Sequence, residues 1–152
     1  MGHEFLDGES VLAFDLETTG ISTNTDRIVQ IALIGSNSTG DTVHYETLVN
    51  PRRPIPPGAS GVHGIFDSDV KGELDFRHHA DEIHRLIENS VVVGHNIRKF
   101  DMPLLENEFR RIGRLPPKPK AMMDTLEIVR RVKLGRPHNL GSLCRRHGIS
   151  LD

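Results

Sequence analysis

The sequence predicts an α/β fold in which one mixed sheet is covered by helices. Residues 11–49 contain three β-type runs joined by turns, and residues 75–132 alternate between helical and strand patterns. Strands joined by short turns pair antiparallel, whereas strand–helix–strand units add parallel neighbours to the same sheet. The chain has 152 residues, the length of one domain with its own core. We therefore expect a single α/β domain.

The first three strands are predicted from short apolar and alternating runs. Residues 11–16 (VLAFDL) are apolar except for one carboxylate, which indicates a buried strand. Residues 28–34 (IVQIALI) form the second strand, and SNSTGD at 36–41 is a hairpin-type connection to a third strand over 42–49. Residues 50–61 contain four prolines and two glycines, so this segment is expected to be a loop.

The second half alternates helices and strands. Residues 75–88 place Phe76, Ala80, Ile83 and Ile87 at helical spacing and predict an amphipathic helix. The remaining elements are a strand over 91–93, a helix from about 100 to 112, a strand over 121–123, and helices over 125–132 and 140–147. For the last helix, Asn139 is the expected N-cap and Gly148 the expected residue after its end.

Composition predicts a cytoplasmic protein that does not enter a membrane. No stretch approaches the roughly 20 apolar residues of a membrane span. The acidic start MGHEFLDGES lacks the apolar region of a secretory signal. Cys144 is the single cysteine, which excludes an internal disulfide and suits a reducing compartment.

Charge is spread unevenly along the chain. Residues 1–97 hold six Lys or Arg against fifteen Asp or Glu, whereas residues 98–152 hold thirteen against six. An acidic half that binds metal ions and a basic half that faces phosphates would suit a nucleic-acid enzyme. Solvated helix faces explain each single basic cluster equally well, so charge alone does not decide the function.

Two carboxylates, Asp15 and Glu17, lie at the end of the first predicted strand. Side chains alternate along a strand, so both carboxylates point to the face opposite Phe14 and Leu16. Like charges side by side repel unless a cation lies between them, and Mg²⁺ or Mn²⁺ prefers carboxylate oxygens. The alternative is a pair of exposed acids beside a turn.

The string Asp15-Leu16-Glu17-Thr18-Thr19-Gly20 resembles the first motif of the DnaQ-like (DEDD) exonucleases, the family of proofreading subunits, oligoribonuclease and related RNases. The nearby DRIVQIA at 26–32 is similar to the second strand of that family. Residues 93–96 (VGHN), followed by Phe100-Asp101, resemble its second motif, in which the matching aspartate is a metal ligand. Without that resemblance, Asp101 could simply be an acid at a helix N-terminus.

The resemblance implies a ribonuclease H-like fold with a sheet of about five strands in the order 3-2-1-4-5 and an antiparallel strand 2. It implies a DEDDh 3′–5′ exonuclease that hydrolyses phosphodiester bonds with two Mg²⁺ or Mn²⁺ ions. Asp15 would bridge both ions, and Glu17 and Asp101 would complete separate sites. The expected partner is a single-stranded 3′ end. DNA is favoured, with RNA as the alternative, because the resemblance leans to DNA polymerase III epsilon-type proofreading domains, and a polymerase is a further candidate partner.

Four further residues are candidate substrate contacts. Residues 62–65 (VHGI) resemble a family segment that contacts the 3′-terminal nucleotide, so His63 and the nearby Phe66 could stack on a base or bond to its backbone. Thr18 and Asn96 are similar candidates. For His63 the alternative is a structural hydrogen bond. Asp124, within MDTL, matches a recurrent family string, but we interpret it as a helix N-cap.

The family's third motif, His-x₄-Asp on a helix, supplies the general base and a fourth carboxylate. His147 and Asp152 have this spacing, but Gly148 would break the helix that must carry them, so we reject this pair. Residues 1–152 are therefore expected to be an exonuclease domain that is incomplete at its C-terminus, lacks the last helix, and is weak or inactive as this chain.

A different class of function remains possible from the sequence. The same fold could serve as a non-catalytic module that binds a nucleic-acid 3′ end or a protein. A ribonuclease H-like endonuclease is disfavoured because the His63 segment suits end recognition. The histidines at 78, 79 and 84 are poorly spaced for a shared zinc ion.

Overall fold

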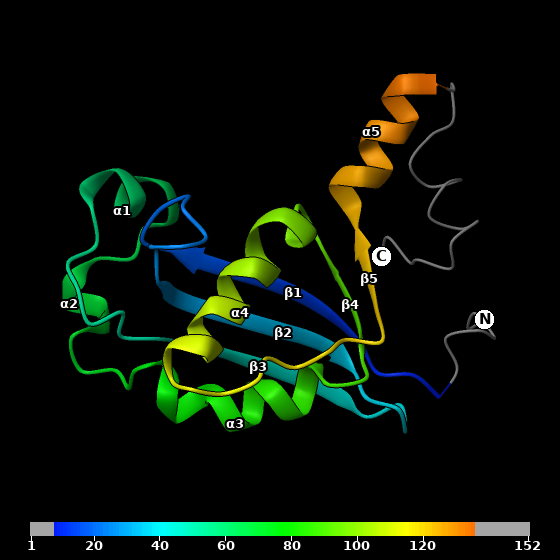
Figure 1. Cartoon of the computed structure of the whole chain (residues 1–152), viewed down its shortest axis with the longest axis horizontal. Helices are drawn as coiled ribbons and strands as arrows, with labels where there is room; N and C mark the ends of the chain where they lie inside the picture. Colours follow the sequence, from blue (N-terminus) through cyan, green and yellow to red (C-terminus); the bar gives the residue numbers. More distant parts are fainter. Residues whose placement is uncertain (1–7, 136–152) are drawn as a thin grey trace.

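A computed structural model describes residues 8–135 of the chain. It contains one five-stranded sheet with the strand order β3-β2-β1-β4-β5 (Figure 1). The predicted strand order is therefore confirmed. The predicted helix over 140–147, with Asn139, Cys144 and Gly148, lies outside the described residues, as do His147 and Asp152.

Three antiparallel strands form one side of the sheet. They are β1 (Val11–Thr18), β2 (Ile28–Ser36) and β3 (Thr42–Leu48). In the β1–β2 pair, Phe14 lies opposite Leu33 and Asp15 opposite Ala32, and the register shifts between Glu17 and Thr18. Strand 2 is antiparallel to both neighbours, as predicted.

Two parallel strands complete the sheet, and the first of them pairs with only part of β1. They are β4 (Val91–Gly94) and β5 (Ala121–Asp124). The β1–β4 pairing joins only residues 11–13 to residues 91–93. The second half of β1, which carries Asp15 and Glu17, therefore continues past the end of β4 with one edge open. Ligands bind characteristically beyond the carboxyl ends of such strands.

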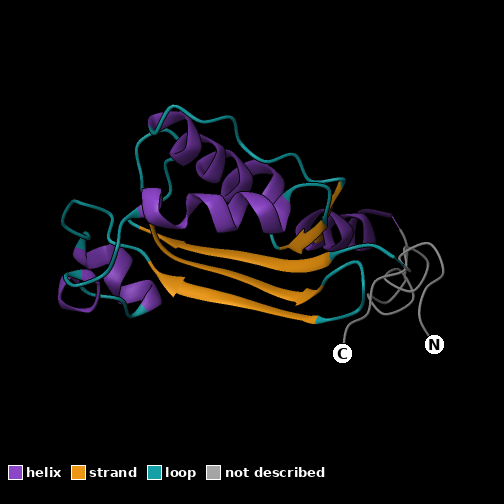
Figure 2. Cartoon of the chain, turned by 90° about the horizontal axis from the view of Figure 1, so that it is seen from below, coloured by secondary structure: helices purple, strands orange, loops and turns teal. Residues whose placement is uncertain are grey.

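The main core lies between the sheet and two helices on one of its faces (Figure 2). These helices are α3 (Phe76–Ile87) and α4 (Met102–Arg111), whose Phe76 and Phe109 rings meet edge to face at 5.1 Å. From β1, Phe14 and Leu16 are buried in this core. Because strand side chains alternate, Asp15 and Glu17 point away from it.

The segment between β3 and α3 departs from the sequence prediction. Part of the expected loop forms α1 (Pro57–His63), followed by α2 (Asp67–Val70). Proline is tolerated at the first helical position because that N–H needs no intrahelical acceptor, and Gly64 ends α1 at a left-handed φ of 75°. A second apolar cluster attaches these helices to β2 through Val29, Ile55, Ile65 and Val70.

The helix predicted from about residue 100 begins earlier and in a different form. A π-helical turn, η2 (Ile97–Asp101), precedes α4. Such turns are rare and often occur at functional sites. After β5 the chain forms α5 (Thr125–Gly135). No helix in residues 8–135 has both the length and the apolar character needed to cross a membrane.

Candidate active site

Asp101 lies against the part of β1 that carries Asp15 and Glu17, where β1 passes the end of β4. Asp101, at the end of η2, is only 5% exposed, and its Oδ2 accepts a hydrogen bond from the backbone N–H of Leu16 at 3.0 Å. Leu16 lies between Asp15 and Glu17 in β1. Asp101 therefore occupies the open edge of β1, close enough to Asp15 for the charge of Asp15 to raise the pKa of Asp101.

All three carboxyl groups have raised pKa values. Burial raises the pKa of Asp101 to about 7, the Leu16 N–H partly opposes this, and the charge of Asp15 raises it further. Burial also raises the pKa of Asp15. For Glu17, burial and then repulsion from Asp15 raise the pKa, while His63 acts in the opposite direction.

This cluster fits hard divalent cations. Asp15, Glu17 and Asp101 offer carboxylate oxygens, and a bound cation would offset the burial that raises the pKa of all three and the repulsion from Asp15 that adds to it for Glu17 and Asp101. Within residues 8–135, no three His, Cys, Asp or Glu side chains form a ready-made metal site. That does not conflict with Mg²⁺, which keeps several waters and takes one or two carboxylates together with substrate phosphates.

A pocket of about 450 Å³ adjoins these carboxylates. Its walls come from the end of β1, the turn after it, helix α1 and η2. The lining residues are Leu16, Glu17, Thr18, Thr19, Gly20, Ile21, Pro56, Gly58, Ala59, Val62, His63 and Phe100. Most of this surface is apolar, and Glu17 is its only carboxylate among the described residues. An apolar pocket beside an anionic cluster suits a base and sugar next to a metal-bound phosphate.

His63 connects α1 to the end of β1. Its Nδ1 accepts a hydrogen bond from the backbone N–H of Ile65 at 3.1 Å, so the ring proton sits on Nε2, which donates to the Thr18 carbonyl at 2.9 Å. Both ring nitrogens thus have protein partners. The structural hydrogen bond considered from the sequence is present, and the ring also lines the pocket.

The other predicted substrate residues are spread more widely. Thr18 lines the pocket, but its hydroxyl donates to the Gly20 carbonyl at 2.7 Å. Asn96 precedes η2 in a left-handed conformation (φ 58°), and its backbone N–H donates to Asp124. Phe66 is 54% exposed at the start of α2 and is not among the pocket-lining residues. Only Thr18 and His63 of these four line the pocket.

Several apolar pocket residues were not named as candidates from the sequence, among them Ile21, Val62 and Phe100. Ile21 and Val62 are 93% and 88% exposed, and Phe100 lines the pocket from η2. Phe100 immediately precedes Asp101, so the motif itself was a signal. Val62 lies in the 62–65 segment that resembles the family's contact with the 3′-terminal nucleotide, so it too had a local signal. Ile21 had none, because only the tertiary structure brings the turn after β1 next to α1.

Asp124 has a structural role that its N-cap interpretation only partly covers. Its Oδ1 accepts hydrogen bonds from the backbone N–H groups of Leu126 at 3.0 Å and Asn96 at 2.9 Å. Its Oδ2 accepts one from the backbone N–H of Arg98 at 3.1 Å. The bond to Leu126 caps α5, as predicted. The other two hold the start of η2 and so fix the turn that carries Asp101.

Comparison with known proteins identifies the family of this chain. The exonuclease family model RNase_T matches residues 12–152. The chain is 31% identical over 147 residues to DNA polymerase III PolC-type of Halalkalibacterium halodurans, covering 96% of this chain and 10% of that protein. It is 35% identical over 153 residues to a DNA polymerase III subunit epsilon-like protein of Rhodobacter capsulatus, covering 96% and 21%. The chain thus spans about a tenth to a fifth of these relatives.

The fold also matches a solved nuclease. Exonuclease I of E. coli in complex with a dT13 oligonucleotide superposes with a TM-score of 0.73 at 22% identity, covering 95% of this chain and 37% of that one. This likeness establishes the ribonuclease H-like fold. Together with the family match, the strand order and the carboxylates at residues 15, 17 and 101, it shows that this chain belongs to the RNase_T exonuclease family, the DnaQ-like group that its motifs resemble.

Proposed function

We propose that this domain removes nucleotides from the 3′ end of single-stranded DNA by metal-dependent phosphodiester hydrolysis. The observation that supports the proposal is the hydrogen bond from Leu16 N–H to the buried Asp101, which holds Asp101 against the strand that carries Asp15 and Glu17, beside an apolar pocket. The relatives named for DNA polymerase III favour DNA over RNA as the substrate. They also make a polymerase a candidate partner.

The chain's own residues would divide the work between holding charge and holding the substrate. Asp15, Glu17 and Asp101 would hold two Mg²⁺ or Mn²⁺ ions, with Asp15 shared between them. Bound ions of this kind lower the pKa of the attacking water and neutralise the charge on the scissile phosphate. Phe100, Val62 and the His63 ring would hold the terminal base and sugar in the apolar pocket, which places the last phosphate over the carboxylates.

The pocket is a candidate site for the terminal nucleotide. Ile21, on the turn after β1, and Val62, on α1, stand exposed at its walls and could contact a base. The match to an exonuclease family favours an exonuclease over an endonuclease, so a circular single strand should resist cleavage.

The test measures metal binding, 3′-end protection and nucleotide release separately. The chain is titrated with Mn²⁺, and a 5′-labelled single strand of DNA or RNA is followed with and without the metal. The variant Asp15→Ala/Glu17→Ala removes two ligands, and Asp41→Ala, an exposed acid in the turn before β3, is the control. We expect Mn²⁺ binding and 3′-end protection with wild type and Asp41→Ala but not with the double variant, and at most slow release of nucleotides from linear DNA by this chain.

The outcomes distinguish the candidate functions. Binding and protection with no detectable release, even at saturating Mn²⁺ and after long incubation, would favour the non-catalytic 3′-end-binding module. Cleavage of the circular strand would favour an endonuclease, and faster release from RNA would reverse the substrate assignment. If the double variant still binds Mn²⁺ and still protects the 3′ end, the proposed site is wrong.

A further inference from the structure

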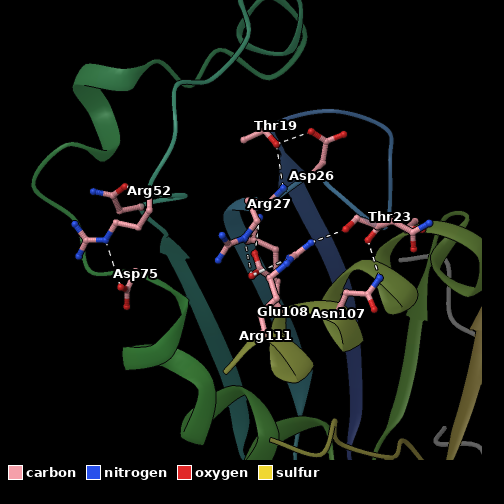
Figure 3. Close-up of polar contacts among 12 residues, drawn as sticks. Thr19, Thr23, Asp26, Arg27, Arg52, Asp75, Asn107, Glu108 and Arg111 are labelled. Carbon is pink, nitrogen blue, oxygen red and sulfur yellow. Dashed lines mark hydrogen bonds and ion pairs between the residues drawn. The ribbon is translucent and has the colours of Figure 1, made fainter. Parts of the chain in front are cut away.

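The turn after β1 is both a wall of the pocket and a segment held from outside by α4. Residues 18–21 line the pocket, and residues 19–27 form the connection to β2, here called the 19–27 loop. Because one face of this loop lines the pocket and the other contacts α4, the position of α4 determines where this wall of the pocket lies. Figure 3 shows the contacts on the helix side.

The loop is closed on itself by Asp26 and Thr19. The Asp26 carboxylate accepts from the Thr19 hydroxyl and the Ser22 N–H, both at 2.8 Å. Thr19 Oγ1 also accepts from the N–H of Arg27 at 3.0 Å. Gly20 sits so close to Asp26 that a Cβ there would lie 2.5 Å from Oδ2. The loop therefore behaves as one compact unit.

Three side chains of α4 attach this unit to the helix. Asn107 Nδ2 donates to the Thr23 carbonyl at 2.8 Å, and Arg111 donates to the Asn24 carbonyl at 2.7 Å (Figure 3). Glu108, 1% exposed, accepts from Arg27 Nε at 2.9 Å and from the Ile28 N–H at 3.0 Å. Each bond joins residues about eighty positions apart in the sequence.

We propose that Asn107 and Arg111 are positioning residues that hold the 19–27 loop as a wall of the 3′-nucleotide pocket. The inference rests on the proposed function for the identity of the ligand. Helix α4 begins directly after Asp101, so one rigid element sets both the metal-binding carboxylate and the pocket wall. Neither side chain lines the pocket; both act through the loop backbone.

Adjacent arginines provide a matched pair of variants. Arg111 reaches the loop, whereas Arg110 donates only to Asn107 of its own helix among the described contacts. Arg111→Ala and Arg110→Ala remove the same charge from neighbouring positions of one helix. A general attraction between basic residues and phosphates would thus be weakened equally. Arg111→Lys keeps a donor that can reach the Asn24 carbonyl and serves as the rescue variant.

The ligand probe is a short single-stranded DNA with a phosphorothioate last linkage, bound in the presence of Mn²⁺. We expect its Kd to rise about 3- to 10-fold for Arg111→Ala and for Asn107→Ala, since a lost hydrogen bond of ordinary strength has an effect of this size. Arg110→Ala should stay within about 2-fold of wild type, and Arg111→Lys should recover most of the affinity. A 3′-phosphorylated strand is the end-specific comparison.

Limited trypsin cleavage after Arg27 supplies a readout that needs no ligand. We expect faster cleavage there for Arg111→Ala and Asn107→Ala than for Arg110→Ala, at matched thermal stability. Faster cleavage without any change in Kd would overturn the inference, as would an equal rise in Kd for Arg110→Ala and Arg111→Ala. Absence of 3′-end binding by wild type would instead overturn the proposed function, while the cleavage comparison would still report whether α4 holds the loop.

Discussion

Asp101 lies in an environment that opposes its own ionisation. It is buried, it faces the charge of Asp15, and its one resolved side-chain partner is the Leu16 N–H. A carboxylate kept in such a place costs stability in the absence of a cation, as is common for functional groups. This cost makes the residue testable without any activity assay.

We predict that Asp101→Asn weakens metal binding without lowering the stability of the fold. The amide keeps an oxygen for the Leu16 N–H and removes a buried charge. Because the folded pKa is raised from 3.8 to about 7, the stability linked to this group is present below 3.8 and lost as pH rises through about 7. At about pH 8 with EDTA, the melting temperature of the variant should therefore equal or exceed that of wild type.

Calorimetry with Mn²⁺ completes this comparison. The variant should bind Mn²⁺ at least about tenfold more weakly, because a neutral amide is a poorer ligand than a carboxylate. Unchanged Mn²⁺ affinity together with a lower melting temperature would mean that Asp101 is a structural acid and not a metal ligand.

At the scale of elements, the junction between β4 and η2 depends on a residue without a side chain. A Cβ on Gly94 would lie 2.5 Å from the Phe14 carbonyl oxygen and would also contact Ile97. The Phe14 carbonyl belongs to the backbone of β1 and cannot move without disturbing the strand that carries Asp15 and Glu17.

We predict that Gly94→Ala lowers the free energy of unfolding by about 1–3 kcal/mol, the usual cost of forcing extra volume into a packed site. Urea denaturation measures the change. Gly61→Ala is the control, because Gly61 lies in α1 with open space around its Cβ position, and alanine there should be neutral or stabilising by up to about 1 kcal/mol. Equal effects of the two substitutions would contradict the close approach at Gly94.

The Asp124 contacts predict a pH dependence of the opposite sign. Burial alone would raise the pKa of Asp124, but hydrogen bonds from backbone N–H groups, including those of Arg98, Asn96 and Leu126, outweigh it and lower the pKa below 3.8. A lowered folded pKa contributes stability that is present above 3.8 and disappears as pH falls through the folded value.

Asp124→Asn should therefore reduce stability at neutral pH, and the difference from wild type should shrink as the pH falls below 3.8. Denaturation curves across this range provide the measurement. Asp67→Asn is the control, since Asp67 accepts a single N–H, that of Ile55. A difference from wild type that does not change with pH would show that the N–H bonds do not depend on the charge of Asp124.

For the whole molecule, Glu108 joins the two halves of the chain. It connects α4 to the start of β2 through Arg27 and Ile28, eighty positions earlier in the sequence. Replacing one partner of a buried charged pair leaves donors without an acceptor. Glu82 and Arg85 form an exposed ion pair of comparable length, which should contribute little.

We predict that Glu108→Gln lowers the free energy of unfolding by about 1–3 kcal/mol, whereas Glu82→Gln stays within about 0.5 kcal/mol of wild type. Tyr45, the only tyrosine, reports unfolding of β3, and far-UV circular dichroism reports the helices. Both signals should shift together, because the sheet interleaves early and late strands. Separate transitions would show that α4 unfolds independently of the sheet.

Much of the architecture could be predicted from local patterns. The alternation in β1 placed Asp15 and Glu17 opposite Phe14 and Leu16, and the apolar spacing of α3 identified its buried face. The loop prediction over 50–61 was wrong from Pro57 onwards, because prolines and glycines were read as breakers although one proline begins α1. The π-helical turn before α4 has no periodic signature and was also missed.

By itself, the sequence determined the strand and helix pattern, the paired carboxylates of β1 and the family motifs, since these depend on residues that are neighbours along the chain. The tertiary structure alone decided that Asp101 reaches the Leu16 N–H, that both His63 nitrogens are engaged, and that the 19–27 loop lies between the pocket and α4. The physical reason is that each of these contacts joins distant segments. Their geometry is set by strand register and core packing, which no local pattern encodes.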